Sequence, residues 1–197
     1  MAADNFLWFP TAATGGLIQA NNANKPLGES TDDWFKAKNA LEVRNINFGV
    51  SQSETTGSGT SGAGAGKAVF REIEIRKDVD LASVPLYVAC AAGAHFPTVM
   101  LAVRKAGGSP LLYLQYCFRM VFVININWSG GGGETAPEET IKFKFGAMGM
   151  QYIKQKPDGR EDTKMQGLWS TAANFPSLNV PGLPAPPSPL FMDGTQS

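Results

Sequence analysis

The glycine-rich residues 53–66 contain the first pattern in the chain that could do chemistry. Gly57, Gly59 and Gly62 form G-x-G-x-x-G, and the Gly-Lys pair that follows is similar to the end of a phosphate-binding loop. A dinucleotide-binding turn requires a helix directly after the glycines, so that the helix N-terminus faces the phosphates. The residues that follow here alternate between apolar and polar, which is typical of a strand. The phosphate-binding loop fails as well, because Ser61 stands where its first glycine belongs and Ala68 where its Ser or Thr belongs. We therefore expect no nucleotide site, and interpret residues 53–66 as a long flexible connection between two strands.

The other potentially reactive residues lack partners in the sequence. His95 is the only histidine and lies between Gly93 and Pro97, away from any nucleophile motif. This context favours a structural turn residue that hydrogen-bonds the backbone. Together with Cys90 and Cys117, it does not supply the four ligands of a structural zinc site. The acidic residues occur singly, without the pairing that acid–base catalysis uses. We therefore expect no catalytic residue, no metal and no cofactor.

Two strands and a turn are predicted around the histidine. Apolar side chains alternate over residues 69–75, as they do in a pleated strand. The charges that follow, at Arg76, Lys77, Asp78 and Asp80, then suit a solvated turn. A second alternating segment, residues 99–103, predicts a strand that ends at the glycine pair behind it.

A short helix is predicted between these strands. Ser83 is the expected N-cap, because its hydroxyl can accept a hydrogen bond from a free backbone N–H of the first turn. The helical run covers residues 84–92, and Gly93 is placed to end it in a left-handed conformation.

In two further strand segments the apolar residues move from odd-numbered to even-numbered positions partway along. This shift occurs once within residues 41–52, and at Gly146 within residues 140–154. Bulges and glycines turn the corners of barrels, so these slips favour a closed, curved sheet. A turn signal at residues 156–159 and a short closing strand within residues 166–171 complete the pattern. We predict a mainly β protein, an antiparallel β-barrel with one short α-helix.

The most apolar strand lies within residues 111–128. Every residue from Met120 to Ile124 is apolar, so both faces of this strand should be buried. Either the chain's own helix or a neighbouring subunit would have to cover the outer face. Asn125 and Asn127 restore the alternation and predict a strand end that reaches solvent. The candidate interface residues are Val121, Phe122, Val123 and Ile124.

The composition excludes several classes of function. The 197 residues are 43% hydrophobic, and 17 Lys and Arg balance 17 Asp and Glu. A net charge of zero argues against nucleic-acid binding, which needs an excess of cations. No apolar run approaches the roughly 20 residues that cross a bilayer, and the N-terminus lacks a basic segment before its short apolar run. We expect a cytoplasmic protein without membrane insertion or cleaved signal peptide, which is compatible with export by a dedicated machine.

Several strings together resemble a known family. They are FREIEIRKDVDLASVPLYVAC and GAHFPTVMLAVRKAGG within residues 70–108, with GEST, FGVSQ and YIKQKPDG on either side. Their order and spacing over residues 28–159 resemble the Hcp family (haemolysin-coregulated protein), which forms the inner tube of bacterial type VI secretion systems. The resemblance implies a phage-tail-tube-like barrel in hexameric rings that stack into a tube. A contractile sheath expels that tube, with a VgrG-like spike at its tip and effector proteins in its lumen, so the protein is secreted.

The resemblance also gives a role to the glycine-rich connection, which in such rings reaches towards the next ring of the stack. The ring–ring stacking residues implied here are Ser53, Thr55, Gly57, Gly59, Gly62 and Gly66.

Two segments lie outside the resemblance. Residues 11–25 look like an inserted loop in a domain of residues 1–173, and residues 174–197 form a Pro-rich tail that should be extended or disordered. Leu190, Phe191 and Met192 in that tail could dock on a neighbour. Two alternative functions stay open. One is a tail tube protein of a phage-like contractile particle, and the other is a monomeric β-barrel binding protein or effector.

Overall fold

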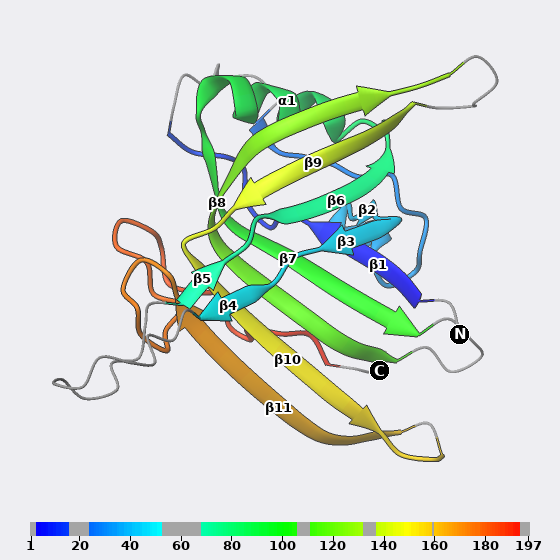
Figure 1. Cartoon of the computed structure of the whole chain (residues 1–197). Helices are drawn as coiled ribbons and strands as arrows, with labels where there is room; N and C mark the ends of the chain where they lie inside the picture. The colour runs from blue at the N-terminus through cyan, green and yellow to red at the C-terminus, as the bar shows by residue number, and fades with distance from the viewer. Residues whose placement is uncertain are drawn as a thin grey trace, which may run out of the picture.

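The computed structural model describes residues 3–15, 24–52, 68–105, 111–131, 137–158 and 160–193. Within these ranges the chain is mainly antiparallel sheet with one α-helix (Figure 1). The elements are β1 (Ala3–Trp8), the 3-10 turn η2 (Lys36–Lys38), β2 (Leu41–Glu42), β3 (Asn45–Asn47), β4 (Val50–Gln52), β5 (Ala68–Phe70), β6 (Ile73–Asp78), α1 (Ser83–Ala92), β7 (His95–Lys105), β8 (Leu112–Ser129), β9 (Glu138–Lys144), β10 (Ala147–Gln155) and β11 (Glu161–Ser170).

The main sheet closes into a barrel, as predicted. Its strand order is β2-β1-β7-β8-β9-β6-β3, and the neighbouring strands pair antiparallel. β2 and β3 follow one another in the chain, and β2 pairs with β1 whereas β3 pairs with β6. Between them, Val43 N–H donates to the carbonyl of Asn5 at 3.0 Å, and Arg44 N–H donates to that of Arg76 at 2.8 Å. The parity slip predicted in residues 41–52 is the point where the chain passes from one edge of the sheet to the other and so closes the barrel.

The barrel interior holds the main hydrophobic core. Ile73 and Ile75 of β6 face inward, as their alternation predicts, and α1 packs Leu86 and Ala89 against the same core. Further members include Leu7, Phe9, Leu41, Phe96, Val99, Leu101, Phe118, Val121, Val123, Ile141 and Phe143. This closed core makes the barrel a rigid support for its outer surfaces.

The helix starts and ends close to the predicted positions, with one correction. Gly93 has φ 63° and ends α1 in the left-handed conformation that was predicted. The N-cap is Ala82, however, and Ser83 is already the first helical residue. No side chain caps the first helical turn; Asp80 instead orders the turn before the helix, since its Oδ1 accepts the N–H of Ala82 at 2.9 Å. Ser83 is buried, and its hydroxyl turns towards Glu139.

The predicted strand 140–154 is two strands, β9 and β10, and the break between them contains Gly146. The long β8 serves both, because residues 122–129 pair with β9 and residues 114–119 pair with β10. β11 is ten residues long, so the short closing strand predicted at residues 166–171 was too short. It pairs with β10, and within the described chain its other edge has no partner strand.

A second apolar layer covers the β7–β8–β10 face opposite the barrel core. Residues 174–193, the described part of the Pro-rich tail, contain no helix or regular strand but lie along this face. Leu178, Val180 and Phe191 are buried there, so Phe191 docks on its own chain rather than on a neighbour. The layer also contains Phe6, Trp8, Phe35, Ala40, Met100, Ala102, Leu112, Cys117 and Ala147.

Two buried side chains of β8 hold this tail in place by recognising its backbone. The amide of Gln115 donates to the carbonyl of Met192 at 2.8 Å and accepts the N–H of the same residue at 2.9 Å. The guanidinium of Arg119 donates to the carbonyl of Pro184 and to the hydroxyl of Thr98. Burial lowers the pKa of Arg119. The covering surface that the sequence required is therefore supplied, on this face, by the chain itself.

Candidate functional site

The four predicted interface residues of β8 divide between two environments. Val121 and Val123 are buried in the barrel core, whereas Phe122 is half-buried and Ile124 is 37% exposed. Ile124 lies where the pairing with β9 shifts register, between Val123 and Asn125. The run is therefore not buried on both faces within one chain. A role for its open face in a subunit interface stays a prediction.

His95 fastens the described end of the inserted loop to the barrel. It is the first residue of β7 rather than a turn residue, and it pairs with Thr14 through backbone hydrogen bonds of 2.8 and 2.9 Å. Its ring lies 3.3 Å from the Thr14 hydroxyl and 5.3 Å, between centroids, from the Phe122 ring. A Cβ added at Gly15 would lie 3.3 Å from the ring. These contacts support the predicted structural role.

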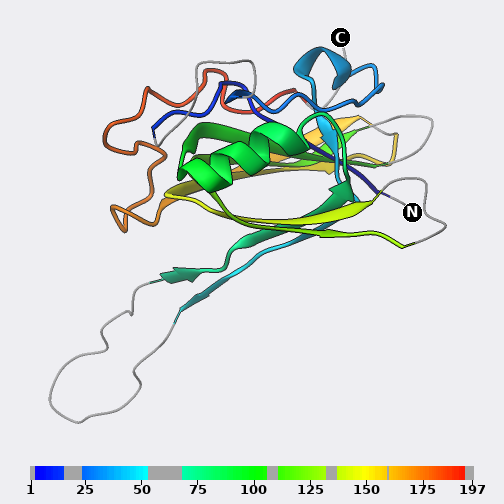
Figure 2. The same cartoon turned by 90° about the horizontal axis from the view of Figure 1, so that it is seen from above.

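The predicted stacking residues at 53–66 lie outside the described residues, but the stem that carries them does not. β4 and β5 form a separate two-stranded sheet that leads away from the barrel (Figure 2). At its base, Phe48 packs on Tyr116 with ring centroids 5.0 Å apart. Further out, Val50 and Val69 are 60% and 57% exposed. The stem is thus anchored at one end and presents apolar side chains to solvent.

Most of the other exposed large apolar side chains gather on two surfaces. The first, here the helix surface, consists of Leu81, Val84 and Tyr87 on and before α1, with Trp128 of β8 beside Tyr87. The Tyr87 and Trp128 rings lie 6.1 Å apart between centroids.

The second, here the hairpin surface, lies on the β10–β11 hairpin and consists of Met150, Tyr152 and Met165. Tyr152 and Met165 are direct cross-strand partners, and Met150 is on the same face of β10. Sequence reasoning missed both surfaces, because a single exposed apolar residue is ordinary and only the fold brings these residues together.

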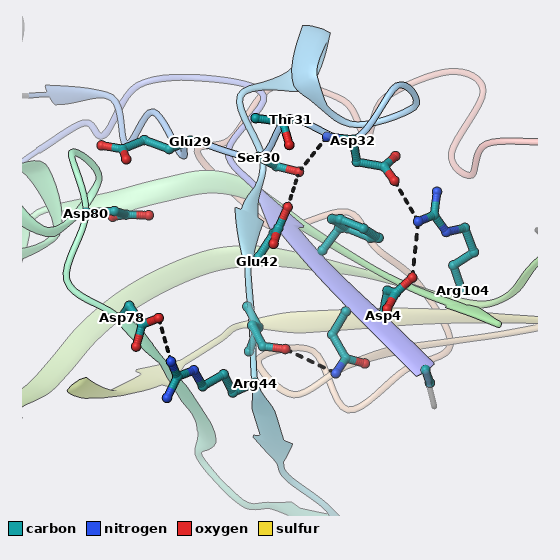
Figure 3. Close-up of a pocket in the computed structure, with 14 residues that line it drawn as sticks. Asp4, Glu29, Ser30, Thr31, Asp32, Glu42, Arg44, Asp78, Asp80 and Arg104 are labelled. Carbon is teal, nitrogen blue, oxygen red and sulfur yellow. Dashed lines mark hydrogen bonds and ion pairs between the residues drawn. The ribbon is translucent and has the colours of Figure 1, made fainter. Parts of the chain in front are cut away.

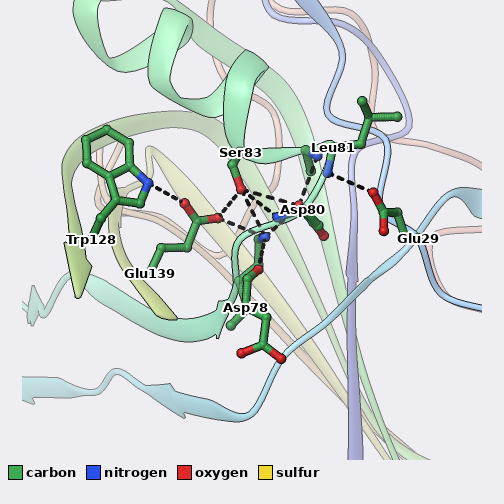
Figure 4. A network of polar contacts seen from close by, with 9 residues as sticks. Glu29, Asp78, Asp80, Leu81, Ser83, Trp128 and Glu139 are labelled. Atoms are coloured by element: carbon green, nitrogen blue, oxygen red, sulfur yellow. Dashed lines mark hydrogen bonds and ion pairs between the residues drawn. The ribbon is translucent and has the colours of Figure 1, made fainter. Parts of the chain in front are cut away.

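A buried polar network holds the helix surface in place (Figure 4). Lys77 is 1% exposed and Glu139 is 0% exposed, and Lys77 Nζ lies 2.8 Å from Glu139 Oε1 and 2.6 Å from Asp80 Oδ1. Ser83 donates to Glu139 Oε1 at 2.7 Å. The indole N–H of Trp128 donates to the other oxygen, Oε2, at 3.0 Å. Every charged member of the network has a partner, as a buried ion pair requires.

The network corrects one sequence prediction. The charged residues 76–80 were expected in a solvated turn, but Lys77 is among the most buried side chains of the chain. Lys77 is two residues after Ile75 and four after Ile73, so it lies on the same inward face of the strand. This spacing was the signal in the sequence for a buried, paired lysine.

An acidic cleft of about 620 Å³ lies beside the start of α1 (Figure 3). Arg104 donates to Asp32 at 2.6 Å and to Asp4 at 3.1 Å. Burial opposes the charge of this guanidinium, but the two carboxylates raise its pKa overall. The charged residues that line the cleft are Asp4, Glu29, Asp32, Glu42, Asp78 and Asp80 together with Arg44 and Arg104.

The described residues contain no other arrangement that suggests reactivity. No group of three or more His, Cys, Asp and Glu side chains in the described part of the chain could hold a metal ion. Burial raises the pKa of the Cys117 thiol to about 12, so this thiol is inert, and Cys90 is partly buried. Among the described residues, no helix is long and apolar enough to span a bilayer.

Comparisons with known proteins agree with this architecture. A family described as "Type VI secretion system effector, Hcp" matches residues 13–152. Protein hcp1 of Pseudomonas aeruginosa is 33% identical over 97 residues, which is 49% of this chain and 60% of that protein. The chain therefore matches somewhat less than two thirds of this curated relative's length.

Solved structures extend the similarity over most of the chain. One described as a type six secretion system protein is 30% identical, with a TM-score of 0.75 over 89% of this chain and all of that one. Hcp1 from Salmonella typhimurium is 28% identical, with a TM-score of 0.66 over 90% of this chain and all of its own. The family match over residues 13–152, together with the closed antiparallel barrel and its single helix, places this chain in the Hcp family of type VI secretion proteins.

Proposed function

We propose that this chain is the tube subunit of a bacterial type VI secretion system. Six copies form a ring around a central hole, and the rings stack into the inner tube. The contractile sheath expels the tube, which bears a spike at its tip and carries effector proteins in its lumen. The role is structural rather than enzymatic, and the protein leaves the cell through the machine that it helps to build.

One observation carries the proposal beyond family membership. The barrel has a complete core and covers a second sheet face with its own tail, yet it leaves both the helix surface and the hairpin surface open. Exposed apolar side chains that gather on one surface, unlike those scattered singly, mark interaction sites. The equal numbers of acidic and basic residues also suit close packing of many copies, since a large net charge would make the copies repel one another.

The β4–β5 stem supports the stacking step. An isolated two-stranded sheet is marginally stable in water, and this one exposes Val50 and Val69 away from the barrel. We infer that a neighbouring ring supports the stem, with residues 53–66 at the contact.

Electron microscopy of the purified full-length chain in negative stain tests this proposal. Rings with a central hole, and end-to-end stacks of them at high concentration, are expected. Compact single particles at all concentrations would contradict it. They would favour the second candidate, a monomeric binding protein, for which the acidic cleft beside α1 would be the site.

A further inference from the structure

The helix surface has the properties of a contact surface rather than of a solvated one. None of the ten residues of α1 is charged. A helix that is apolar all round is normally buried on every side. Here Leu86 and Ala89 face the core, whereas Val84 and Tyr87 are more than half exposed on the opposite side. Something outside this chain is therefore expected to cover that side.

Trp128 is fixed in a position suited to such a contact. Its side chain is 53% exposed, but its indole N–H is held by the fully buried carboxylate of Glu139. Lys77 and Ser83 hold that carboxylate in turn. An exposed aromatic ring that is already ordered loses little conformational entropy when a partner binds, and Trp and Tyr dominate interface hot spots. The buried network thus orders an anchor before any partner arrives.

The hairpin surface offers a chemically matching partner on the same molecule. Met150 and Met165 carry flexible thioether side chains, which pack favourably against aromatic rings. α1 and the β10–β11 hairpin lie at opposite ends of the molecule in Figure 1, so one copy cannot bring its own two surfaces together.

Opposite charges lie beside the two surfaces. Next to the helix surface, the exposed Glu29 accepts the N–H of Leu81 and forms no ion pair with a described residue, whereas Asp78 and Asp80 are already paired with Arg44 and Lys77. At the turn of the β10–β11 hairpin, Lys156 and Arg160 are exposed and form no ion pair with a described residue. Complementary charges steer two surfaces together and fix their register.

We propose that the hairpin surface of one copy docks on the helix surface of the next copy around the ring, with Trp128 as the central anchor. The inference rests on the proposed ring. Because the two surfaces differ and lie far apart, the contact is heterologous, and repeating it closes a ring when the rotation per copy allows. The same contact would bring the cations of the hairpin turn towards the carboxylate of Glu29, which accepts the N–H of Leu81.

Disulfide cross-linking of the full-length chain tests the contact. The partly buried Cys90 is replaced by alanine, and Cys117 stays because it is buried and inert. In this background, the double variant Val84→Cys and Met165→Cys is oxidised and its covalent multimers are separated under denaturing conditions. A ladder that rises through dimer and trimer to six copies is expected. Each single variant should give no ladder, nor should the matched pair Val84→Cys and Phe175→Cys, whose second site is exposed elsewhere.

The outcomes separate this inference from the function on which it rests. Rings in the microscope without a ladder from the Val84–Met165 pair would overturn the inference and leave the tube function standing. A parent chain that forms no rings would overturn both.

A second variant covers the case of poor cysteine geometry. Trp128→Ala should weaken association about tenfold or more, as expected for a hot spot, whereas Phe175→Ala should leave association unchanged. Circular dichroism verifies that both variants are folded. Unchanged association of folded Trp128→Ala would also overturn the inference.

Discussion

The substitution Lys77→Met tests the buried network most sharply. The methionine fills a similar volume but removes the cation, so Glu139 would be left buried with only the donors from Ser83 and Trp128. Removing one partner of a buried ion pair typically costs about 3–5 kcal/mol of the free energy of unfolding. For a chain of this length, that cost lowers the melting temperature by roughly 6–20 °C.

Thermal and urea unfolding followed by circular dichroism measure this cost. The chain concentration must be held constant, because association stabilises the folded state in a concentration-dependent way. The matched control is Lys142→Met. Its ammonium lies 3.4 Å from Glu74 and its side chain is 38% exposed, so its loss should cost about 1 kcal/mol or less.

A second comparison tests the reason for the cost. The double variant Lys77→Met, Glu139→Met should regain much of the lost stability, because the fully buried carboxylate is removed together with its cation and only the partly exposed Asp80 loses an ion pair. A cost below about 1 kcal/mol for Lys77→Met, equal to that of the exposed control, would refute the reasoning.

Three further predictions concern other parts of the chain. Gly28→Ala should lower the free energy of unfolding by about 1–3 kcal/mol, because a Cβ there would lie 2.2 Å from the backbone carbonyl oxygen of Ala40. Gly131→Ala is the control in the same unfolding assay, because a Cβ at that position would meet nothing within 4 Å. Gln115→Leu should release the tail by removing both hydrogen bonds to Met192, so limited proteolysis should cut the tail first. An unchanged cleavage pattern would show that Gln115 does not hold the tail. Shortening residues 53–66 to a tight turn should spare the ring but reduce stacking in electron micrographs, and normal tubes would argue against a stacking role.

Local rules were sufficient to predict much of the barrel. The alternation in β6, the left-handed end of α1 at Gly93 and the corner at Gly146 all follow from short-range backbone chemistry. Ser83 was misplaced by one residue because its hydroxyl donates to Glu139, 56 residues away, instead of capping the helix, and local sequence does not show that contact.

The rest depends on contacts between distant segments. The tail has no periodic pattern, so nothing in its own sequence shows that Phe191 packs across β8 and β10 or that Gln115 binds its backbone. The two exposed surfaces likewise combine residues far apart in the chain, such as Tyr87 with Trp128. Such surfaces become visible only when the topology is known.

The central claim is that copies of this chain assemble through surfaces that a single copy leaves open. Native mass spectrometry of the purified full-length protein tests it most directly. The account predicts a dominant species of six times the 21.0-kDa chain mass, which Trp128→Ala shifts towards smaller species and Phe175→Ala does not. A single 21.0-kDa species at every concentration would contradict the account.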